Sequence, residues 1–470
     1  MNVEQSTSFP MTKDAFFYSF RAQTADEAYP ILLESGRFGQ QSIAAWDPLA
    51  VVQSTADGIH IQWRDGNEEV RQGEPLALTE AFVNSYHIDA PHDRFYGGAL
   101  GFITYDYVRR IETLPAIAQA DVDVPDIYFY VVDCWTVYDV QTETAQVMKL
   151  STSHVDIEAM AQTWSDVAQQ ALQARQFDEK TAARAVANDE RRLKSMSQQQ
   201  FNEAVEKIQR YIEAGDVFQV NLSVRQEEQL VAQPIDVYEA LRTFNPSPYM
   251  AFMRAPQFAV VSGSPELLIE KYGDALATRP IAGTRPRGED DAADLALAKD
   301  LIDNEKERAE HLMLVDLERN DLGRVSVYGS VHVDEFMVIE KYSHVQHIVS
   351  NVRGTMRPDQ TNADMIRAVF PGGTITGAPK IRTMEIIEEL EPVRRGLYTG
   401  SIGWLGFNGD AVLNIVIRTA FIQQQTAYIQ AGAGIVIDSV PKREYVESLN
   451  KAKAMWQAKQ MAEVQYDFND

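Results

Sequence analysis

The chain has 470 residues, of which 45% are hydrophobic and 10% aromatic, enough for a large core in two or three domains or one large duplicated domain. Its formal net charge of −25 argues against nucleic acid or an anionic membrane as the main partner, because either would repel the protein. The single cysteine, Cys134, cannot form an internal disulfide, which fits a reducing compartment.

The N-terminus lacks the basic start and long apolar run of a secretory signal. Apolar stretches such as Ile127 to Trp135 are far shorter than the roughly 20 residues that span a bilayer. We therefore expect a soluble cytoplasmic protein with no nucleic acid or membrane partner.

Two regions follow one another along the chain. Residues 1 to about 150 alternate short strand-like runs with turns, and residues 155 to about 198 are polar and helical. A connection is predicted from Thr181 to Ser195, where apolar residues are few. From about 199 to 460 helical patterns alternate with strands, so the predicted domains are 1–185 and 195–460.

Two segments resemble each other across these regions. In YGGALGF, Tyr96, Gly98, Gly101 and Phe102 match four positions of YTGSIGW, namely Tyr398, Gly400, Gly403 and Trp404. This similarity indicates either an internal duplication or a chance recurrence of a glycine-rich strand start.

The segment NEKERAEHLMLVDLERNDLG predicts a helix that ends near Gly323, a plausible C-terminal cap. Glu307 and Glu310 are three residues apart and so lie on one face. At about 100° per residue, Leu314 and Leu317 fall on the same face. Carboxylates that continue an apolar stripe are unusual, because solvated charges normally lie opposite the core.

A second helix is predicted after Asp438 and Ser439, either of which is a suitable cap. It carries Glu444, Glu447 and Lys451 on one face. Four carboxylates from two helices would repel unless a divalent cation bound them, and an all-oxygen ligand set favours Mg²⁺. The alternative, favoured by composition alone, is that both faces are ordinary solvated charges.

Three glycine-containing runs are candidates for binding an anion: TRPIAGTRPRG, FPGGTITGAPK and IQAGAGIVIDS. Gly283 lets the backbone approach a ligand, and Thr284 adds an amide and a hydroxyl. Gly432 to Gly434 interrupt a strand, which suggests a bulge or a ligand against exposed amides. Arg418, at the end of the strand NIVIRT, is suited to grip a carboxylate bidentately.

Each of these runs is also compatible with a simple tight turn. None matches a nucleotide-binding fingerprint. Two anion-binding elements and a carboxylate-bound metal together indicate a small dicarboxylate substrate.

Taken together, these motifs resemble the chorismate-utilising enzymes, which comprise the anthranilate, aminodeoxychorismate, isochorismate and salicylate synthases. The resemblance is strong over the C-terminal 260 or so residues and extends more weakly to the N-terminal part through PILLESG and YGGALGFITYDY. It implies an α+β fold of orthogonally packed antiparallel sheets flanked by helices, with the active site in a cleft of the C-terminal part.

The resemblance also implies roles for individual residues. Mg²⁺ is expected at Glu310 and Glu447, with Glu307 and Glu444 as their helix partners. Glu266, in GSPELL, matches the acid that protonates the departing C4 hydroxyl, and His347 and Thr374 match positions that line the ring site. Positions expected to contact chorismate are Gly283, Thr284, Tyr398, Arg418, Gly432, Ala433 and Gly434, with Lys451 nearby.

Within the family, the nucleophile is expected to be ammonia. Members that add water carry a lysine base where this chain has Gln219, and glutamine cannot deprotonate water. Asn221 in QVNLS and the runs FPGGTITGAPK and YTGSIGW resemble the aminodeoxychorismate synthase branch. Ala282 resembles the anthranilate synthase branch instead, because many aminodeoxychorismate synthases have a proposed nucleophilic lysine there, so both products stay open.

The resemblance implies a separate glutamine amidotransferase subunit that supplies the ammonia. This chain has no evident glutaminase nucleophile, because Cys134 lies in an apolar strand-like run. The PILLESG segment, with Ser35, matches a site where relatives hold tryptophan, and Pro248, Tyr249 and Met250 are further candidates for a tryptophan-like ligand.

Overall fold

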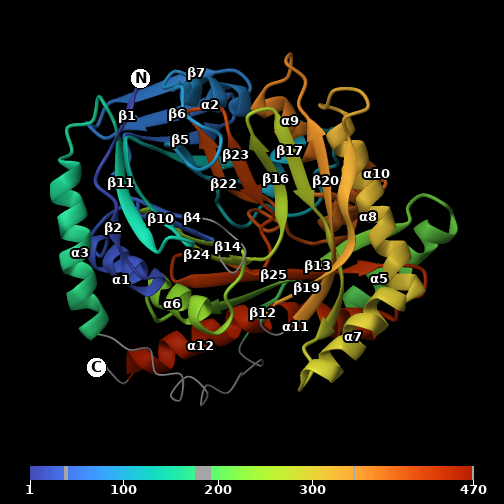
Figure 1. The fold of residues 1–470 in the computed structure, drawn as a ribbon. Coiled ribbons are helices and arrows are strands. Elements are labelled where there is room, and N and C mark those ends of the chain that lie inside the picture. Colours follow the sequence, from blue (N-terminus) through green and yellow to red (C-terminus); the bar gives the residue numbers. More distant parts are fainter. Residues whose placement is uncertain (36–40, 175–191, 343–344, 468–470) are drawn as a thin grey trace.

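The computed structural model describes residues 1–35, 41–174, 192–342 and 345–467. These residues form two antiparallel sheets surrounded by helices (Figure 1), which confirms the predicted α+β class. The predicted connection from Thr181 to Ser195 falls mostly on residues 175–191, outside the described residues.

Sheet A has 13 strands, and β2 (Phe9–Pro10) and β21 (Gly377–Ala378) pair beside its main path. Its main path runs in the order β1 (Val3–Gln5), β11 (Thr144–Leu150), β10 (Cys134–Asp139), β4 (Gln41–Ala45), β3 (Ile31–Ser35), β14 (Tyr249–Arg254), β15 (Ala259–Ser264), β24 (Thr419–Gln423), β25 (Thr426–Ile435), β13 (Gln219–Gln229) and β12 (Leu193–Lys194).

Sheet B has 12 strands, and β19 (His332–Lys341) pairs with β20 beside its main path. The main path runs in the order β18 (Ile281–Pro286), β20 (Val345–Thr355), β17 (Ala275–Arg279), β16 (Leu267–Tyr272), β23 (Ala411–Asn414), β22 (Ser401–Gly406), β8 (Gly98–Ile103), β9 (Ile127–Val132), β5 (Ala50–Thr55), β6 (Gly58–Trp63) and β7 (Glu68–Gln72).

None of the helices in the described part of the chain combines the length and the hydropathy that a transmembrane span requires. The helices are α1 (Lys13–Gln23), α2 (Pro75–Asn84), η1 (Tyr105–Arg110), α3 (Ile157–Ala174), α5 (Gln198–Glu213), α6 (Pro234–Phe244), α7 (Asp291–Asp303), α8 (Glu305–Gly323), α9 (Asn362–Val369), η3 (Gly373–Ile375), α10 (Lys380–Leu390), α11 (Pro441–Lys451) and α12 (Lys453–Asp467).

The two similar glycine-rich segments lie side by side at the centre of sheet B. They form β8 and β22, and Gly101 pairs directly with its counterpart Gly403. Outward from this pair the order is β9, β5, β6, β7 on one side and β23, β16, β17, β20 on the other. Sheet A repeats the pattern about β3 and β14. The strand order therefore supports an internal duplication, with strands of both repeats in both sheets.

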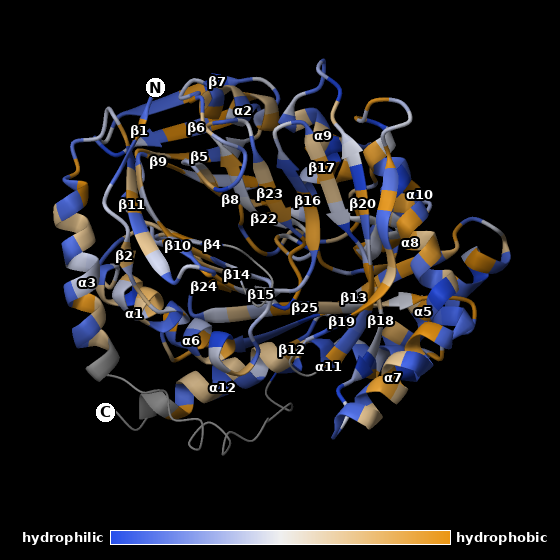
Figure 2. Ribbon diagram, in the orientation of Figure 1, coloured by the Kyte–Doolittle hydropathy of each residue, from blue (hydrophilic) through white to orange (hydrophobic). Residues whose placement is uncertain are grey.

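Buried apolar residues form the core between these layers. Many of the strands carry hydrophobic segments, coloured orange in Figure 2. The largest core cluster joins the two sheets, with Ile43 and Val260 from sheet A and Val52 and Phe129 from sheet B. A second cluster packs α1, α3, α6 and α12 against the outer face of sheet A, and it includes Trp164. Each such side chain contributes about 1.5–3 kcal/mol by its burial.

The central glycine pair generates a prediction about stability. A Cβ at position 403 would overlap the Val412 carbonyl oxygen on the neighbouring strand, so Gly403→Val should destabilise the fold by about 1–3 kcal/mol through overpacking. Chemical denaturation measures this as a lower midpoint. Gly323→Ala is the matched control, because a Cβ there meets no atom within 4 Å and should stabilise the helix. A midpoint for Gly403→Val at or above that of the wild type would contradict this packing.

Candidate active site

Helix α8 carries the first pair of carboxylates. Asn304 caps it, since its side chain accepts a hydrogen bond from the Glu307 amide, and the helix then buries Leu314 against the sheet. The helix ends at Gly323 as predicted, but Gly323 is inside the last turn and Arg324 is the C-cap. The glycine therefore does not act as a left-handed cap.

Helix α11 carries the second pair, Glu444 and Glu447. Neither predicted cap is used: Val440 occupies the N-cap position without a side-chain hydrogen bond, and Pro441 begins the helix. Ser439 instead accepts a hydrogen bond from the Val436 amide in the preceding turn. Proline is favoured at the first helical position because a backbone N–H group there would have no hydrogen-bond partner within the helix, so its absence costs nothing.

Both helices contribute to one cavity of about 610 Å³, to which nearly all the predicted site residues also belong. The predicted residues that line it are Glu266, Gly283, Thr284, Glu307, Glu310, His347, Thr374, Tyr398, Arg418, Gly432, Gly434, Glu444, Glu447 and Lys451. Ala433 does not line it and is buried in the core formed with α5 and α10.

The four glutamates of this cavity differ in their surroundings. Glu307 accepts from the Arg285 guanidinium at 3.1 Å, and Glu447 pairs with Lys451 at 2.9 Å. Burial, and then the charge of Glu307, raise the pKa of Glu310. Burial, and then the charge of Glu447, raise the pKa of Glu444. The charges thus disfavour one another, and a cation between the helices would relieve that cost.

The carboxylates of the cavity fit a magnesium ion that only one or two side chains bind directly. No group of three acidic, histidine or cysteine side chains in the described parts of the chain is arranged to hold a metal. Mg²⁺, however, is usually held by one or two carboxylates, with water and substrate oxygens completing its octahedron. Glu310 and Glu447 are able to supply such a set, with Glu307 and Glu444 as neighbours.

Glu266 lies deep in the cavity, in the link that carries the chain from β15 of sheet A to β16 of sheet B. It is 6% exposed, and its Oε1 has no hydrogen-bond partner among the described residues. Burial raises the pKa of Glu266 to about 7, although Thr374, the Ile281 amide and Arg418 each lower it. A carboxyl group with this pKa is suited to give up a proton near neutral pH.

His347 is held as a neutral ring. Its Nδ1 lies 3.0 Å from the Gly283 carbonyl oxygen, which can only accept, so Nδ1 carries the proton. The Thr284 hydroxyl, 3.1 Å from the same nitrogen, then accepts as well. Burial lowers the pKa of His347 to about 4, so Nε2 keeps its lone pair. The ring is able to accept a hydrogen bond or a proton at Nε2.

The structure explains the glycines at position 283 and at positions 432 and 434 in different ways. Gly283 has φ +61° at a register shift in β18, and a Cβ there would lie 3.0 Å from the Glu307 Oε2. Gly432 and Gly434 form no bulge, because β25 pairs with β13 in unbroken register. Their missing side chains make room for Asn221 and Gln219 instead. The alternation of a regular strand directs Ala433 to the opposite face, which differs from the prediction.

The sequence predicted Arg418 at the end of a strand. The structure places it instead in the link from β23 of sheet B to β24 of sheet A. Its φ of +50° is in the left-handed region, which is uncommon for a residue with a side chain. Its guanidinium has no hydrogen bond or ion pair among the described residues, and burial lowers its pKa. A carboxylate ligand would satisfy this charge.

Four polar residues of the cavity were not predicted as site residues: Asn221, Lys306, Gln430 and Ser439. The Asn221 Oδ1 and the Gln430 Oε1 are buried and have no hydrogen-bond partner among the residues that the structure describes. The strand periodicity around Gly432 and Gly434 could have predicted Gln430 as a site residue, since Gln430 lies two residues before Gly432 and so shares its face of the strand.

The four residues proposed for a tryptophan-like ligand line a separate cavity of about 480 Å³. Ser35 comes from β3, Tyr249 and Met250 come from the start of β14, which pairs with β3, and Pro248 directly precedes β14. Tyr272 and Trp404 add aromatic surface from sheet B. This cavity therefore lies at the junction of the two repeats, separate from Glu266 and the four glutamates.

Comparison with known proteins agrees with this geometry. Residues 29–457 match the family model described as chorismate binding enzyme. The chain is 50% identical to aminodeoxychorismate synthase component 1 of Bacillus subtilis (strain 168), over 97% of this chain and 96% of that protein. It is 40% identical to anthranilate synthase component 1 of Acetivibrio thermocellus, over 91% and 89% of the two chains.

A solved structure of anthranilate synthase component I from Streptococcus pneumoniae TIGR4 superposes with a TM-score of 0.75 at 34% identity, and the match covers 90% of this chain and 93% of that one. Sequence, fold and cavity thus agree, and the chain belongs to the family of chorismate binding enzymes.

Proposed function

We propose that the chain is component I of an aminodeoxychorismate synthase, which converts chorismate and ammonia to 4-amino-4-deoxychorismate and water. The observation that carries the proposal is Gln219, whose side chain lines the cavity and donates to Glu310 at 3.4 Å. An amide cannot act as the base that a water nucleophile needs, whereas ammonia needs no such base. The 50% identity to an aminodeoxychorismate synthase component supports this product.

Anthranilate synthesis is the second candidate, and Ala282 favours it. This residue lines the cavity and is 9% exposed, so no lysine is present there to attack the ring covalently. Under the first candidate, ammonia or another group must take over that step.

In the overall reaction of the first candidate, a C–N bond replaces the C4–O bond, and the hydroxyl leaves as water with a proton from Glu266. The nitrogen then returns a proton to the enzyme.

The cavity residues divide into those that orient chorismate and those that move protons. Arg418 binds one carboxylate of chorismate, and Tyr398 and the strand with Gly432 and Gly434 support the ring. Glu266 protonates the departing hydroxyl. His347 accepts at Nε2, and Thr374 and Lys451 line the ring site. Removal of the leaving hydroxyl as water lowers the barrier, since hydroxide is a poor leaving group.

Magnesium would be held by Glu310 and Glu447, with Glu307 and Glu444 adjacent. When bound, the ion supplies a positive charge that anchors a chorismate carboxylate and stabilises negative charge in the ring. The raised pKa values of Glu310 and Glu444 support this assignment, since neither carboxylate forms an ion pair within the described part of the chain. Ammonia would come from a glutamine amidotransferase subunit, in the cytoplasm. Cys134 would remain reduced there, and burial raises the pKa of its thiol to about 12.

We also propose that the cavity between β3 and β14 holds a small aromatic ligand such as tryptophan. Its aromatic surface, together with Ser35 and the carboxyl group of Glu270 in its lining, supports a ligand with an apolar ring and a polar end.

Product identification tests the proposed reaction. With chorismate, Mg²⁺ and an ammonium salt, the protein should form a product that aminodeoxychorismate lyase converts to 4-aminobenzoate. Reactions without ammonium should leave chorismate unchanged and serve as the control. Fluorescent anthranilate as the product would reject the first candidate in favour of the second, and unchanged chorismate in every reaction would reject both.

Substitution of the glutamates tests the magnesium assignment. Glu310→Ala and Glu447→Ala should each abolish Mg²⁺-dependent turnover and weaken Mg²⁺ binding measured by calorimetry with chorismate present, because each removes a carboxylate ligand. Glu305→Ala is the control, since Glu305 is exposed on α8 outside the cavity and its loss should leave both measurements unchanged. Full turnover by either of the first two variants would refute the assignment.

The pH profile tests the role of Glu266. Only the protonated carboxyl can donate, so kcat/KM for chorismate, which reports groups of the free enzyme, should fall as pH rises through about 7. Glu266→Gln should lose this limb and lower kcat by about 10²–10⁴-fold while chorismate still binds. A wild-type kcat/KM for chorismate that is flat through this region, or a fully active glutamine variant, would show that another group is the acid.

A further inference from the structure

Arg395 and Glu391 form an ion pair that is almost completely buried. Their side chains are 1% and 3% exposed, and two parallel hydrogen bonds join them, Nη2 to Oε1 at 2.8 Å and Nε to Oε2 at 3.0 Å. Glu391 is the C-cap of α10, and Arg395 follows four residues later in the link to β22. Burial alone would lower the pKa of Arg395, but the charge and hydrogen bonds of Glu391 raise it above its ordinary value. Desolvation offsets most of the attraction in such a pair, so a gain in stability does not explain it.

The remaining donors of Arg395 reach three separate segments. Its Nη2 donates to the Asn221 carbonyl oxygen of β13 at 2.7 Å, and its Nη1 donates to the Ile375 carbonyl oxygen of η3 at 2.9 Å. Nη1 also donates to the Thr399 hydroxyl at 3.3 Å, and that hydroxyl donates to the Tyr398 carbonyl oxygen at 2.6 Å. All five N–H groups of the guanidinium therefore have an acceptor. Because the guanidinium is planar and rigid, it fixes these segments relative to one another.

The same guanidinium also holds the ring of Tyr398. The guanidinium carbon lies 5.4 Å from the centre of the Tyr398 ring and 5.0 Å from that of Tyr105, which are cation–π contacts. Thr399, the next residue in the chain, has φ +61°, which is rare for a β-branched side chain. Such a backbone conformation persists only where its surroundings hold it, and the hydrogen bond from Arg395 is one of these restraints.

Glu391 extends these contacts to Gln430. Its Oε1 accepts from the Ser223 amide at 2.9 Å and from the Ser223 hydroxyl at 2.7 Å. The carboxylate can only accept, so the hydroxyl of Ser223 must donate to it. That hydroxyl then accepts from the Gln430 Nε2 at 2.8 Å, which fixes the orientation of the amide.

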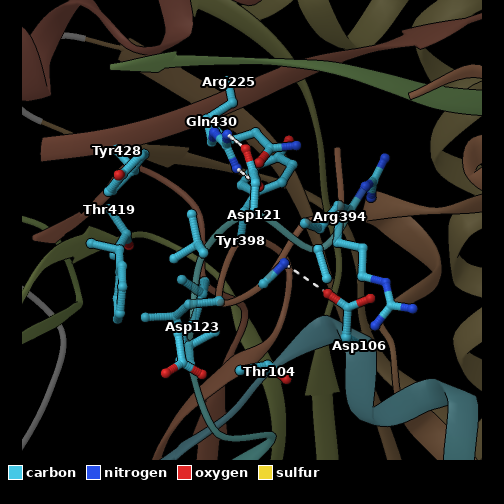
Figure 3. Close-up of a pocket in the computed structure, with 18 of the residues that line it drawn as sticks. Thr104, Asp106, Asp121, Asp123, Arg225, Arg394, Tyr398, Thr419, Tyr428 and Gln430 are labelled. Atoms are coloured by element: carbon cyan, nitrogen blue, oxygen red, sulfur yellow. Dashed lines mark hydrogen bonds and ion pairs between the residues drawn. The ribbon is translucent and has the colours of Figure 1, made fainter. Parts of the chain in front are cut away.

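The ion pair itself lies outside the substrate cavity. Arg395 lines a second cavity of about 340 Å³, which shares Tyr398 and Gln430 with the substrate cavity. Figure 3 shows this second cavity, with Gln430 at one end. The residues contacted by the pair, directly or through one other residue, that line the substrate cavity are Asn221, Ile375, Tyr398 and Gln430. Arg395 thus reaches the walls of the substrate cavity from behind, without touching the substrate.

We infer that the pair of Arg395 and Glu391 positions the ring site for amination, with Arg395 as the positioning residue. It holds β13, η3 and the turn at Tyr398 in one arrangement around the chorismate ring. The inference rests on the proposed function, in which Tyr398 and Thr374 line that ring site. In the same proposal Arg418 and the cation hold the carboxylates of chorismate. Loss of the Arg395 contacts should therefore disturb the orientation of the ring more than the affinity for chorismate.

Arg395→Lys tests this role in assays with chorismate, Mg²⁺ and ammonium chloride, well below the unfolding midpoint. Lysine keeps the charge beside Glu391 but cannot make the five fixed hydrogen bonds, so kcat should fall about 10–100-fold while the KM for chorismate rises less than about threefold. Arg242→Lys is the matched control, because Arg242 makes the same two parallel hydrogen bonds to the buried Glu34, each at 3.1 Å, outside the substrate cavity. It should also lower the unfolding midpoint but leave kcat unchanged.

Thr399→Val is a second variant that leaves the ion pair intact. It removes only the hydroxyl between Arg395 and the Tyr398 carbonyl oxygen, and kcat should fall about fivefold, which corresponds to one neutral hydrogen bond. Thr79→Val is its control, because the buried Thr79 hydroxyl of α2 donates to the Pro75 carbonyl oxygen at 2.8 Å, outside the substrate cavity. This control should keep the wild-type kcat.

The outcomes separate the inference from the proposed function. A kcat of Arg395→Lys no lower than that of Arg242→Lys, or an effect on KM alone, would overturn the positioning role and leave the proposed function standing. If Arg395→Lys does not fold, a fully active Thr399→Val would overturn the role instead. A wild type that does not aminate chorismate would reject the proposed function itself.

Discussion

Repulsion within two pairs of glutamates that line one cavity, Glu307 with Glu310 and Glu444 with Glu447, is the constraint around which the site is arranged. Glu307 and Glu447 are each balanced by a cation, whereas burial and a like charge raise the pKa of Glu310 and Glu444. Helices α8 and α11 hold these groups in place through packing elsewhere along their lengths, so the unfavourable charge is sustained by the core. Under the proposed function, a cation bound together with an anionic substrate would relieve this unfavourable charge.

The sequence predicted which residues gather at the site far better than it predicted the backbone structure that holds them there. Helical spacing brought Glu307 and Glu310 to one face, because that depends only on local geometry. The roles of Gly432 and Gly434 depend on Gln219 and Asn221 of a strand distant in sequence, which no local pattern reveals. The segment around Arg418 likewise has the sequence pattern of a strand. The strand is interrupted there because the chain crosses from sheet B to sheet A. Gln430 was overlooked because its free acceptor results from a chain of contacts through Ser223 and Glu391.

Two residues with proposed roles in the reaction lie where the chain passes from one sheet to the other. Glu266 lies on the crossing from β15 to β16, and Arg418 lies on the returning crossing from β23 to β24. The first repeat makes equivalent crossings, from β4 to β5 and from β9 to β10, without these residues. Regular strands fix both ends of each crossing, so short irregular segments are held rigidly while their side chains reach the cavity. The duplication thus provides a scaffold on which the second repeat carries the residues proposed for the reaction.

The direct pairing of Gly101 with Gly403 also determines the order in which this protein can assemble. The ribosome must release most of the chain before the central pair of sheet B can form, and the same holds for β3 and β14 in sheet A. Until then the first repeat exposes an apolar strand edge on each sheet. Contacts between such distant segments slow folding, and unpaired edges invite aggregation. We therefore expect nascent chains of this protein to depend on chaperones until the second repeat has emerged.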